Sequence, residues 1–122
     1  MNITYDGSKL QIDGKAVETP SPIREAFAVR WGVIVLMDQF ADLKGPVLDI
    51  REIRNAPKGT NLFCYSPDGT LLWKAELPTG ENSEDYYYRV SSRSPLVVNS
   101  FSSYRCEIDP ATGRIIGKDF FK

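Results

Sequence analysis

Histidine is absent from this sequence of 122 residues. Imidazole is the usual proton acceptor near neutral pH and the base of Ser-His and Cys-His pairs, so those nucleophilic mechanisms are excluded. The common zinc sites that need imidazole are excluded with them. Neither a G-x-G-x-x-G sequence nor a P-loop motif is present. We therefore expect neither an enzyme activity nor a bound cofactor or metal.

Cysteine and long apolar runs are also scarce. The only two cysteines, Cys64 and Cys106, lie among apolar neighbours in apparent strands, which predicts buried free thiols; a disulfide between them is the minority alternative. The longest apolar run, VIVLM at 33–37, is far shorter than the roughly 20 residues that span a bilayer. The polar N-terminal segment lacks the pattern of a signal peptide. We expect a cytoplasmic protein without membrane contact.

An excess of charge is the third feature that is missing. Fifteen basic and sixteen acidic side chains leave a formal net charge of −1. Domains that grip a phosphate backbone usually carry a clear positive excess, so we do not expect a nucleic-acid partner. The length and the ordinary balance of 42% hydrophobic and 25% charged residues predict one globular domain over residues 1–122.

Alternating side chains and turn residues are abundant instead. Asp-Gly pairs at 6–7 and 13–14 predict an N-terminal hairpin within residues 1–18, before Thr19–Pro22 interrupts strand pairing. The alternation of apolar residues over 23–30 favours a strand, although it leaves an amphipathic helix open. Residues 33–36 are apolar on both faces, which predicts a strand covered on both sides.

An internal repeat joins the two halves of the chain. Residues 63–73 correspond to residues 106–116, with Ser66 and Asp109 opening equivalent turns, and residues 33–35 correspond to 96–98. The sequence therefore predicts an all-β fold, mainly an antiparallel meander of two four-stranded units, 23–77 and 86–121, in addition to the N-terminal hairpin. Because two blade-like units cannot close a ring, we expect one continuous or folded-over antiparallel sheet whose apolar faces pack together or against a second copy.

Two segments carry a resemblance to known families. Residues 102–115, SSYRCEIDPATGRI, resemble the blade ending of quinoprotein-type propellers, in which an aspartate and a Thr-Gly turn precede the last strand. Together with NLFCYSPDGTLLW at 61–73, they resemble small, mostly uncharacterised bacterial proteins of similar length. Some members of that group look like immunity proteins, which neutralise toxins of the contact-dependent type in the cytosol. The resemblance covers the last two thirds of the chain and transfers no active site.

Glu107 and Asp109 form the one candidate pair of catalytic carboxylates. They lie two apart on a predicted strand, which places their side chains on one face about 6–7 Å apart, near the range that glycoside hydrolysis requires. The alternative is that Asp109 bonds its own backbone to open a turn, while Glu107 lies on a solvated face. We favour the alternative.

The connection at 39–60 is longer than an ordinary hairpin loop. Val47, Ile50 and Ile53 follow Pro46 at helical spacing, so we expect one short helix near 46–54 that covers the sheet. Arg51 and Arg54 would project from that helix as contacts for a partner.

A second candidate segment contains three acidic residues followed by three tyrosines. Glu81, Glu84 and Asp85 precede Tyr86 and Tyr87, and alternation on a strand would bring at least one tyrosine of this run to the surface. Tyrosine is enriched at protein interfaces, and nearby acids would speed the encounter with a basic partner. The alternative is a solvated acidic turn beside core tyrosines. Phe101 and Tyr104 complete the predicted contact set.

These observations predict a non-enzymatic, protein-binding module. The expected function is a cytosolic immunity protein that neutralises a cognate toxin, such as a nuclease with a basic cleft, by occluding its active site. The alternative is a structural or assembly β module that pairs with itself, as a homodimer, or with another chain through its sheet edges. Single-stranded nucleic acid could stack on Phe101 and Tyr104, but the net charge argues against that partner.

Overall fold

The computed structural model describes residues 1–39, 60–80 and 85–120, and these residues form eleven strands and no helix. The strands are β1 (Ile3–Asp6), β2 (Lys9–Ile12), β3 (Lys15–Glu18), β4 (Ile23–Val29), β5 (Gly32–Met37), β6 (Leu62–Tyr65), β7 (Leu71–Lys74), β8 (Tyr87–Arg93), β9 (Leu96–Ser100), β10 (Tyr104–Ile108) and β11 (Ile115–Phe120). The expected all-β class is confirmed. The helix expected near 46–54 lies outside the described residues.

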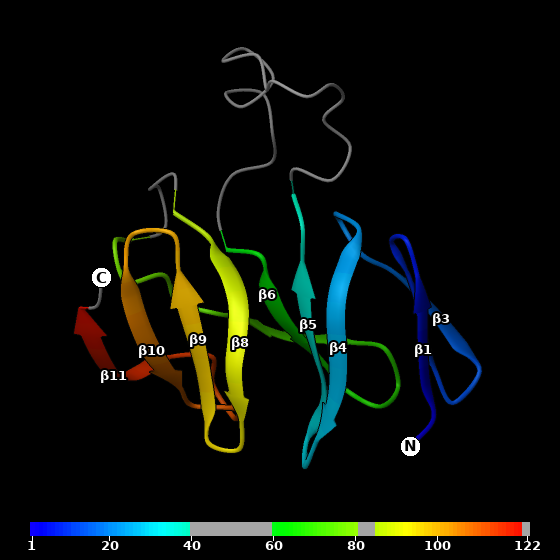
Figure 1. Cartoon of the computed structure of the whole chain (residues 1–122). Coiled ribbons are helices and arrows are strands. Elements are labelled where there is room, and N and C mark those ends of the chain that lie inside the picture. The colour runs from blue at the N-terminus through cyan, green and yellow to red at the C-terminus, as the bar shows by residue number, and fades with distance from the viewer. Residues whose placement is uncertain (40–59, 81–84, 121–122) are drawn as a thin grey trace, which may run out of the picture.

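The strands form three antiparallel sheets, each of which follows the order of the chain (Figure 1). We call them the N-terminal sheet (β1–β2–β3), the middle sheet (β4–β5–β6–β7) and the C-terminal sheet (β8–β9–β10–β11). The two four-stranded units are as predicted, but they form two separate sheets rather than one continuous sheet. The N-terminal element is a three-stranded sheet rather than a hairpin. Asp13 and Gly14, with φ of 50° and 83°, make a second tight turn that carries the chain into β3.

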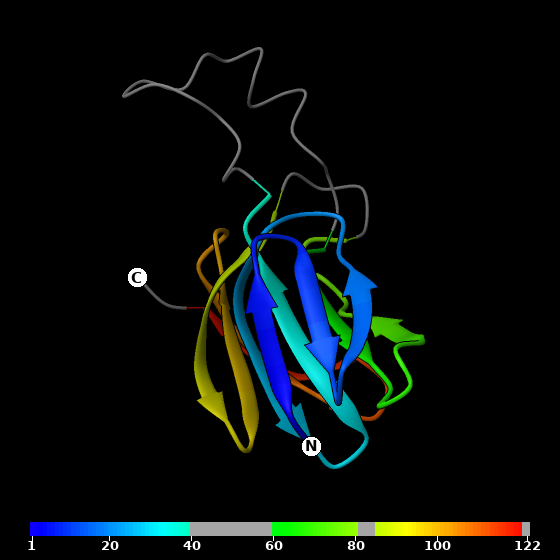
Figure 2. The same cartoon turned by 90° about the vertical axis from the view of Figure 1, so that its right-hand side faces the viewer.

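The sheets stack in chain order, with the middle sheet buried on both faces. One apolar cluster joins the middle and C-terminal sheets and includes Ile34, Leu36, Cys106 and Ile108. A second cluster joins the N-terminal sheet to the opposite face of the middle sheet, where Leu10 and other residues meet β5. All six residues of β5 are buried, which confirms that this strand is covered on both sides. Figure 2 views the stack with the N-terminal sheet in front.

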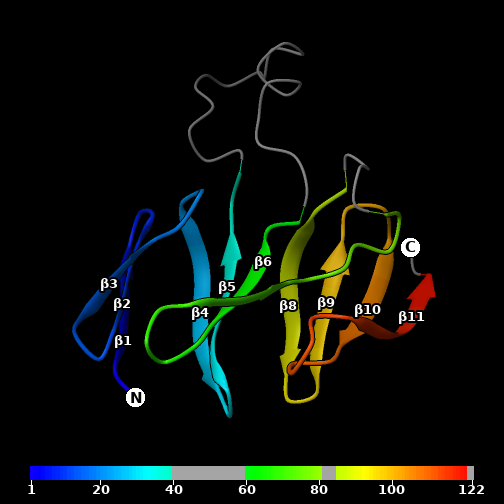
Figure 3. The same cartoon turned by 180° about the vertical axis from the view of Figure 1, so that it is seen from behind.

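The internal repeat extends to strand register and turn geometry. Ile34 pairs with Cys64 and Leu36 with Leu62 in the middle sheet; Val97 pairs with Glu107 and Asn99 with Arg105 in the C-terminal sheet. In both hairpins, β6–β7 and β10–β11, the register shifts one or two residues before the turn. Equivalent backbone bonds close both turns, from Gly69 to Ser66 at 2.9 Å and from Thr112 to Asp109 at 3.2 Å. Figure 3 shows β6 and β10 from behind.

Two polar links also hold the middle and C-terminal sheets together. The side-chain amide of Asn61, just before β6, donates to the Met37 carbonyl at 2.7 Å and the Tyr87 carbonyl at 2.6 Å, and its oxygen accepts from the Tyr87 N–H at 2.8 Å. Arg93 forms an ion pair with Glu25 at 3.0 Å, and its guanidinium lies 4.6 Å from the centre of the Phe27 ring.

Both cysteines are buried free thiols, which confirms that expectation. Burial raises the pKa of the Cys64 thiol to about 11, although a backbone hydrogen bond from Val33 opposes the shift. Burial likewise raises the pKa of Cys106. Both groups are therefore neutral at physiological pH.

Candidate protein-interaction site

A buried carboxylate organises the end of the C-terminal sheet where β8 begins. Asp85 is 6% exposed, and one of its oxygens accepts from the backbone N–H groups of Tyr86 at 2.9 Å and Ser102 at 3.0 Å. Its other oxygen accepts from the hydroxyls of Ser102 at 2.6 Å and Thr79 at 2.9 Å. Because charge-assisted hydrogen bonds are strong, Asp85 ties three separate segments into one rigid platform.

Two aromatic rings stand on this platform. Tyr86 and Phe101 stack with their centroids 5.1 Å apart and an interplanar angle of 12°, and the Phe101 N–H donates to the Tyr86 carbonyl at 2.8 Å. Phe101 is 67% exposed, the largest exposure of any large apolar residue in the described part of the chain. A large ring held rigidly at the surface is the kind of group that dominates binding energy at protein interfaces.

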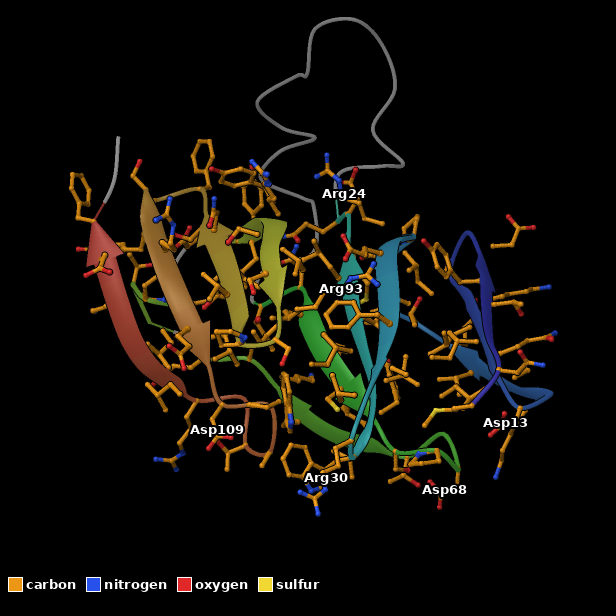
Figure 4. The ribbon with its side chains drawn as sticks, turned by 60° about the horizontal axis from the view of Figure 1, so that its bottom comes forward. Asp13, Arg24, Arg30, Asp68, Arg93 and Asp109 are labelled. Atoms are coloured by element: carbon orange, nitrogen blue, oxygen red, sulfur yellow. The ribbon has the colours of Figure 1, made fainter. Side chains whose placement is uncertain are left out.

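Charged groups from the middle sheet border Tyr86. Burial raises the pKa of the Tyr86 phenol; the Asp38 carboxylate raises it further, whereas Arg24 lowers it. The phenol is therefore protonated at neutral pH and can donate a hydrogen bond. Arg24 is exposed near the start of β4, at the end of the molecule opposite to Arg30 (Figure 4). Sequence reasoning missed both Arg24 and Asp38, because neither lies near the tyrosines in the sequence.

Tyr104 belongs to a different environment from the Tyr86–Phe101 pair. Its ring meets Phe120 edge to face at a centroid distance of 5.5 Å, and the Lys118 ammonium lies 5.2 Å from its centre. It packs against the core between the two sheets. Phe101 and Tyr104 therefore do not form one continuous aromatic face.

Two of the predicted contact residues are buried and serve the fold instead. Tyr87 is 1% exposed in the core, and its hydroxyl donates to the Glu76 carbonyl. Asp85 is occupied by the four donors described above, so it does not offer its charge to a basic partner. Groups from distant segments therefore cover both of these predicted contact residues. Arg51, Arg54, Glu81 and Glu84 lie outside the described residues.

The two candidate catalytic carboxylates lie in different local structures, because Glu107 is on β10 and Asp109 opens the turn that follows it. Asp109 accepts a hydrogen bond from the Ala111 N–H at 2.9 Å, as the turn interpretation predicts, while Glu107 is exposed on β10. In residues 1–39, 60–80 and 85–120 there is no group of three or more side chains that could hold a metal ion. Within the same ranges there is no helix that is long and apolar enough to cross a membrane.

A buried amide on β9 is the feature that sequence reasoning missed entirely. Asn99 is 6% exposed, and its side-chain oxygen has no hydrogen-bond partner among the described residues. Its register partners are Arg105 on β10 and Arg89 on β8, and both arginines are exposed. The internal repeat could have drawn attention to Asn99, because the equivalent residue of the first unit is the apolar Leu36.

These features define an all-antiparallel β protein of three stacked sheets with a rigid aromatic pair at one end. The chain belongs to the family described as "Domain of unknown function (DUF7957)", whose model matches residues 1–120. Neither the curated proteins nor the solved structures contain a significant match to the chain.

Proposed function

We propose that this protein is a non-enzymatic binding module, an immunity protein that neutralises a cognate toxin by occluding its active site. The observation that carries the proposal is the stacked Tyr86–Phe101 pair, in which a 67% exposed ring is fixed by the buried Asp85 platform. Little side-chain entropy remains to be lost when such a ring enters a pocket of the partner, so more of its contact energy appears as affinity.

The toxin-neutralising role rests on the resemblance of residues 61–73 and 102–115 to small immunity proteins. We further propose a cytoplasmic location, which the two buried free thiols support. We also propose that the two four-stranded sheets are blade-like units related to those of propellers. Their shared register and turn bonds support that relationship.

The test uses the tagged full-length chain as bait in its native cytosol, followed by mass spectrometry and by purification of the product of the adjacent gene. We expect a one-to-one complex that abolishes the toxicity of that product in cells. Phe101→Ala should weaken the complex by about 30-fold, as expected for a hot-spot residue worth about 2 kcal/mol.

Phe120→Ala is the matched control, since Phe120 is 62% exposed and also lies in an aromatic pair, but its partner is Tyr104 rather than Tyr86 or Phe101. It should leave the affinity unchanged. Equal weakening by both variants would remove the aromatic pair as the binding site. A neighbouring product that is toxic yet unaffected by this protein would refute the immunity function.

An assembly module remains the second candidate, favoured by the position of β11 at the edge of its sheet. This strand is an edge of the C-terminal sheet and exposes Ile116 (60%) and Phe120 (62%). Exposed apolar edge strands pair readily with another chain. If this function holds, light scattering should show a dimer that Ile116→Lys converts to a monomer, whereas a monomer at all concentrations would exclude self-pairing.

A further inference from the structure

The chain contains three Asp-Gly pairs, all in described residues and all at tight turns: Asp6-Gly7, Asp13-Gly14 and Asp68-Gly69. The three aspartates are exposed, and each glycine has the positive φ that its turn requires. An aspartate before glycine can rearrange, because glycine has no side chain to keep its amide nitrogen away from the neighbouring carboxyl carbon. The pairs share this chemistry but differ in the hydrogen bonds that hold their reacting atoms.

The rearrangement consumes no reagent other than water. The glycine nitrogen attacks the protonated carboxyl group of the aspartate; an N–C bond forms, the C–OH bond breaks, and the hydroxyl leaves as water with the amide proton. Water then hydrolyses the five-membered succinimide. When the ring opens at the main-chain carbonyl, the chain continues through the side-chain carbon as an isoaspartyl residue of unchanged mass. Because the ring closes within one residue, the rate depends on how freely the carboxyl group and the amide nitrogen approach each other.

The pair at 68–69 is held at both reacting atoms. The Asp68 carboxylate accepts from the Ser66 hydroxyl and from the Thr70 N–H at 3.1 Å, and these hydrogen bonds lower its pKa to about 2. The attacking nitrogen, that of Gly69, donates to the Ser66 carbonyl at 2.9 Å. The carboxylate therefore stays ionised and the nitrogen stays engaged, which opposes ring closure in the folded protein.

The pair at 13–14 is held at one atom. Asp13 lies at the turn between β2 and β3 (Figure 4), and one of its carboxylate oxygens accepts from the Asn2 N–H at 2.7 Å. The Gly14 N–H has no hydrogen-bond partner in the part of the chain that the structure describes. We therefore expect partial protection at this pair.

At the turn between β1 and β2, both reacting groups are free of partners within residues 1–39, 60–80 and 85–120. Neither the Asp6 carboxylate nor the Gly7 N–H takes part in a hydrogen bond or an ion pair there. Apart from its chain neighbours, no heavy atom lies within 4 Å of a Cβ built on Gly7. We propose that Asp6 is a modification site, at which isoaspartate forms spontaneously in the folded protein. None of the residues involved belongs to the proposed binding site.

The modification acts on the attachment of the N-terminal sheet. The Gly7 carbonyl accepts from the Ile23 N–H at 2.7 Å, and the same turn sets the register in which Tyr5 pairs with Leu10. An isoaspartyl residue adds one atom to the main chain in this turn, so either the register or the bond to Ile23 must change. Leu10 then loses part of its packing in the cluster between the N-terminal and middle sheets. Modified molecules should therefore unfold at a lower temperature.

The test is incubation of the folded full-length protein in mildly acidic buffer, followed by trypsin digestion and mass spectrometry with electron-transfer fragmentation, which distinguishes isoaspartate from aspartate. Each Asp-Gly pair falls in its own tryptic peptide, 1–9, 10–15 or 59–74, so one sample gives all three rates. The same chain unfolded in urea is the reference, because the hydrogen bonds of the fold are absent there.

Folding should leave the rate at Asp6 within about threefold of the unfolded reference and lower the rate at Asp68 at least about tenfold, with Asp13 between them. Equal protection at Asp6 and Asp68, or no isoaspartate at Asp6 in the folded protein, would overturn the proposal.

Two variants test the physical causes. Ser66→Ala should raise the rate at Asp68 in the folded protein, because it removes a hydrogen bond from the carboxylate. An unchanged rate would show that these hydrogen bonds do not control the reaction, and would overturn the assignment. Asp6→Glu keeps the charge but requires a six-membered ring, so the 1–9 peptide should remain unmodified and the melting temperature should not fall during incubation. A fall equal to that of the unaltered protein would show that Asp6 is not the site responsible.

Discussion

At the scale of single residues, two buried asparagines illustrate opposite uses of the same side chain. Asn61 is 4% exposed and makes three hydrogen bonds to backbone groups of Met37 and Tyr87, whereas the equally buried Asn99 leaves its oxygen unpaired. The first contributes to the fold, because it satisfies groups that the stacked sheets would otherwise bury without partners. The second has no such structural role among the described residues.

Asn61→Ala should therefore lower the free energy of unfolding by about 3 kcal/mol, since it leaves the Tyr87 N–H and two carbonyls unpaired. Urea denaturation followed by circular dichroism measures the change. Asn99→Val is the matched control and should be neutral or stabilising. A loss below about 1 kcal/mol in Asn61→Ala would mean that water replaces the amide.

The buried thiol of Cys64 predicts a stability loss in alkali. Its pKa is raised by burial from 9.0 to about 11, so between these values the unfolded chain has lost a proton that the folded chain retains. Stability is therefore unaffected below pH 9 and falls as the pH rises toward 11. In Cys64→Ala the slope of the unfolding free energy over this range should be shallower by up to about 1.4 kcal/mol per pH unit.

The slope, rather than the absolute stability, is the informative quantity, because the alanine also creates a cavity that is independent of pH. Tyr87 and Cys106, whose pKa values are raised in the same direction, still titrate in the variant. Some alkaline destabilisation should therefore remain. Parallel slopes for the two proteins would contradict the role assigned to Cys64.

At the scale of elements, the pairing of β5 with β6 requires a residue without a side chain at the start of β5. A Cβ atom on Gly32 would lie 2.0 Å from the Tyr65 carbonyl oxygen and 3.2 Å from the Ser66 Cα atom, both of which belong to the backbone. Because a backbone cannot move aside as a flexible side chain does, the β5–β6 hydrogen bonds would have to separate.

Gly32→Ala should accordingly destabilise the protein by about 3 kcal/mol. Gly117→Ala in β11 is the matched control, since no atom lies within 4 Å of its added Cβ, and it should change stability by less than about 0.5 kcal/mol. Thermal unfolding of both variants gives the comparison. Equal melting temperatures for the two would show that β5 and β6 separate at little cost.

The strands could be predicted from the sequence, but the contacts that they make beyond their own hairpins could not. Alternation and turn residues identified the strands of both four-stranded sheets, because these signals act between neighbouring residues. The third strand of the N-terminal sheet was missed although Asp13-Gly14 indicated a second turn. The segment 15–18 has only four residues, and most of them are exposed, so it carries little strand signal. The burial of Tyr87 and Asp85 depends on Glu76, Thr79 and Ser102, which lie in other segments.

At the scale of the whole molecule, β5 couples two apolar clusters that would otherwise be separate. Leu10 packs against one face of the middle sheet, and Trp73 belongs to the cluster on the other face. Since the same backbone carries both faces, loss of either cluster should unfold the entire described structure in one transition.

Leu10→Ala should lower the free energy of unfolding by about 3 kcal/mol, the usual cost of a large cavity. The Trp73 fluorescence, read in a Trp31→Phe background, should report the same shift as far-UV circular dichroism. Leu10 is 0% exposed, whereas Leu72→Ala, at a leucine that is 48% exposed, serves as the control with little effect. If the unfolding transition reported by Trp73 fluorescence is unchanged in Leu10→Ala, the two clusters belong to independently folding parts.

The sequence by itself determined the β class, the four-stranded repeat, the free thiols and the covered strand at 33–36. Each follows from local alternation, turn chemistry or composition, which are properties of neighbouring residues. The tertiary structure alone decided that the N-terminal sheet occupies one face of the middle sheet and that the outer face of the C-terminal sheet ends the stack. It also buried Asp85, exposed Phe101 and left Asn99 without a partner. These outcomes depend on groups brought together from distant strands, and no local pattern encodes such distances.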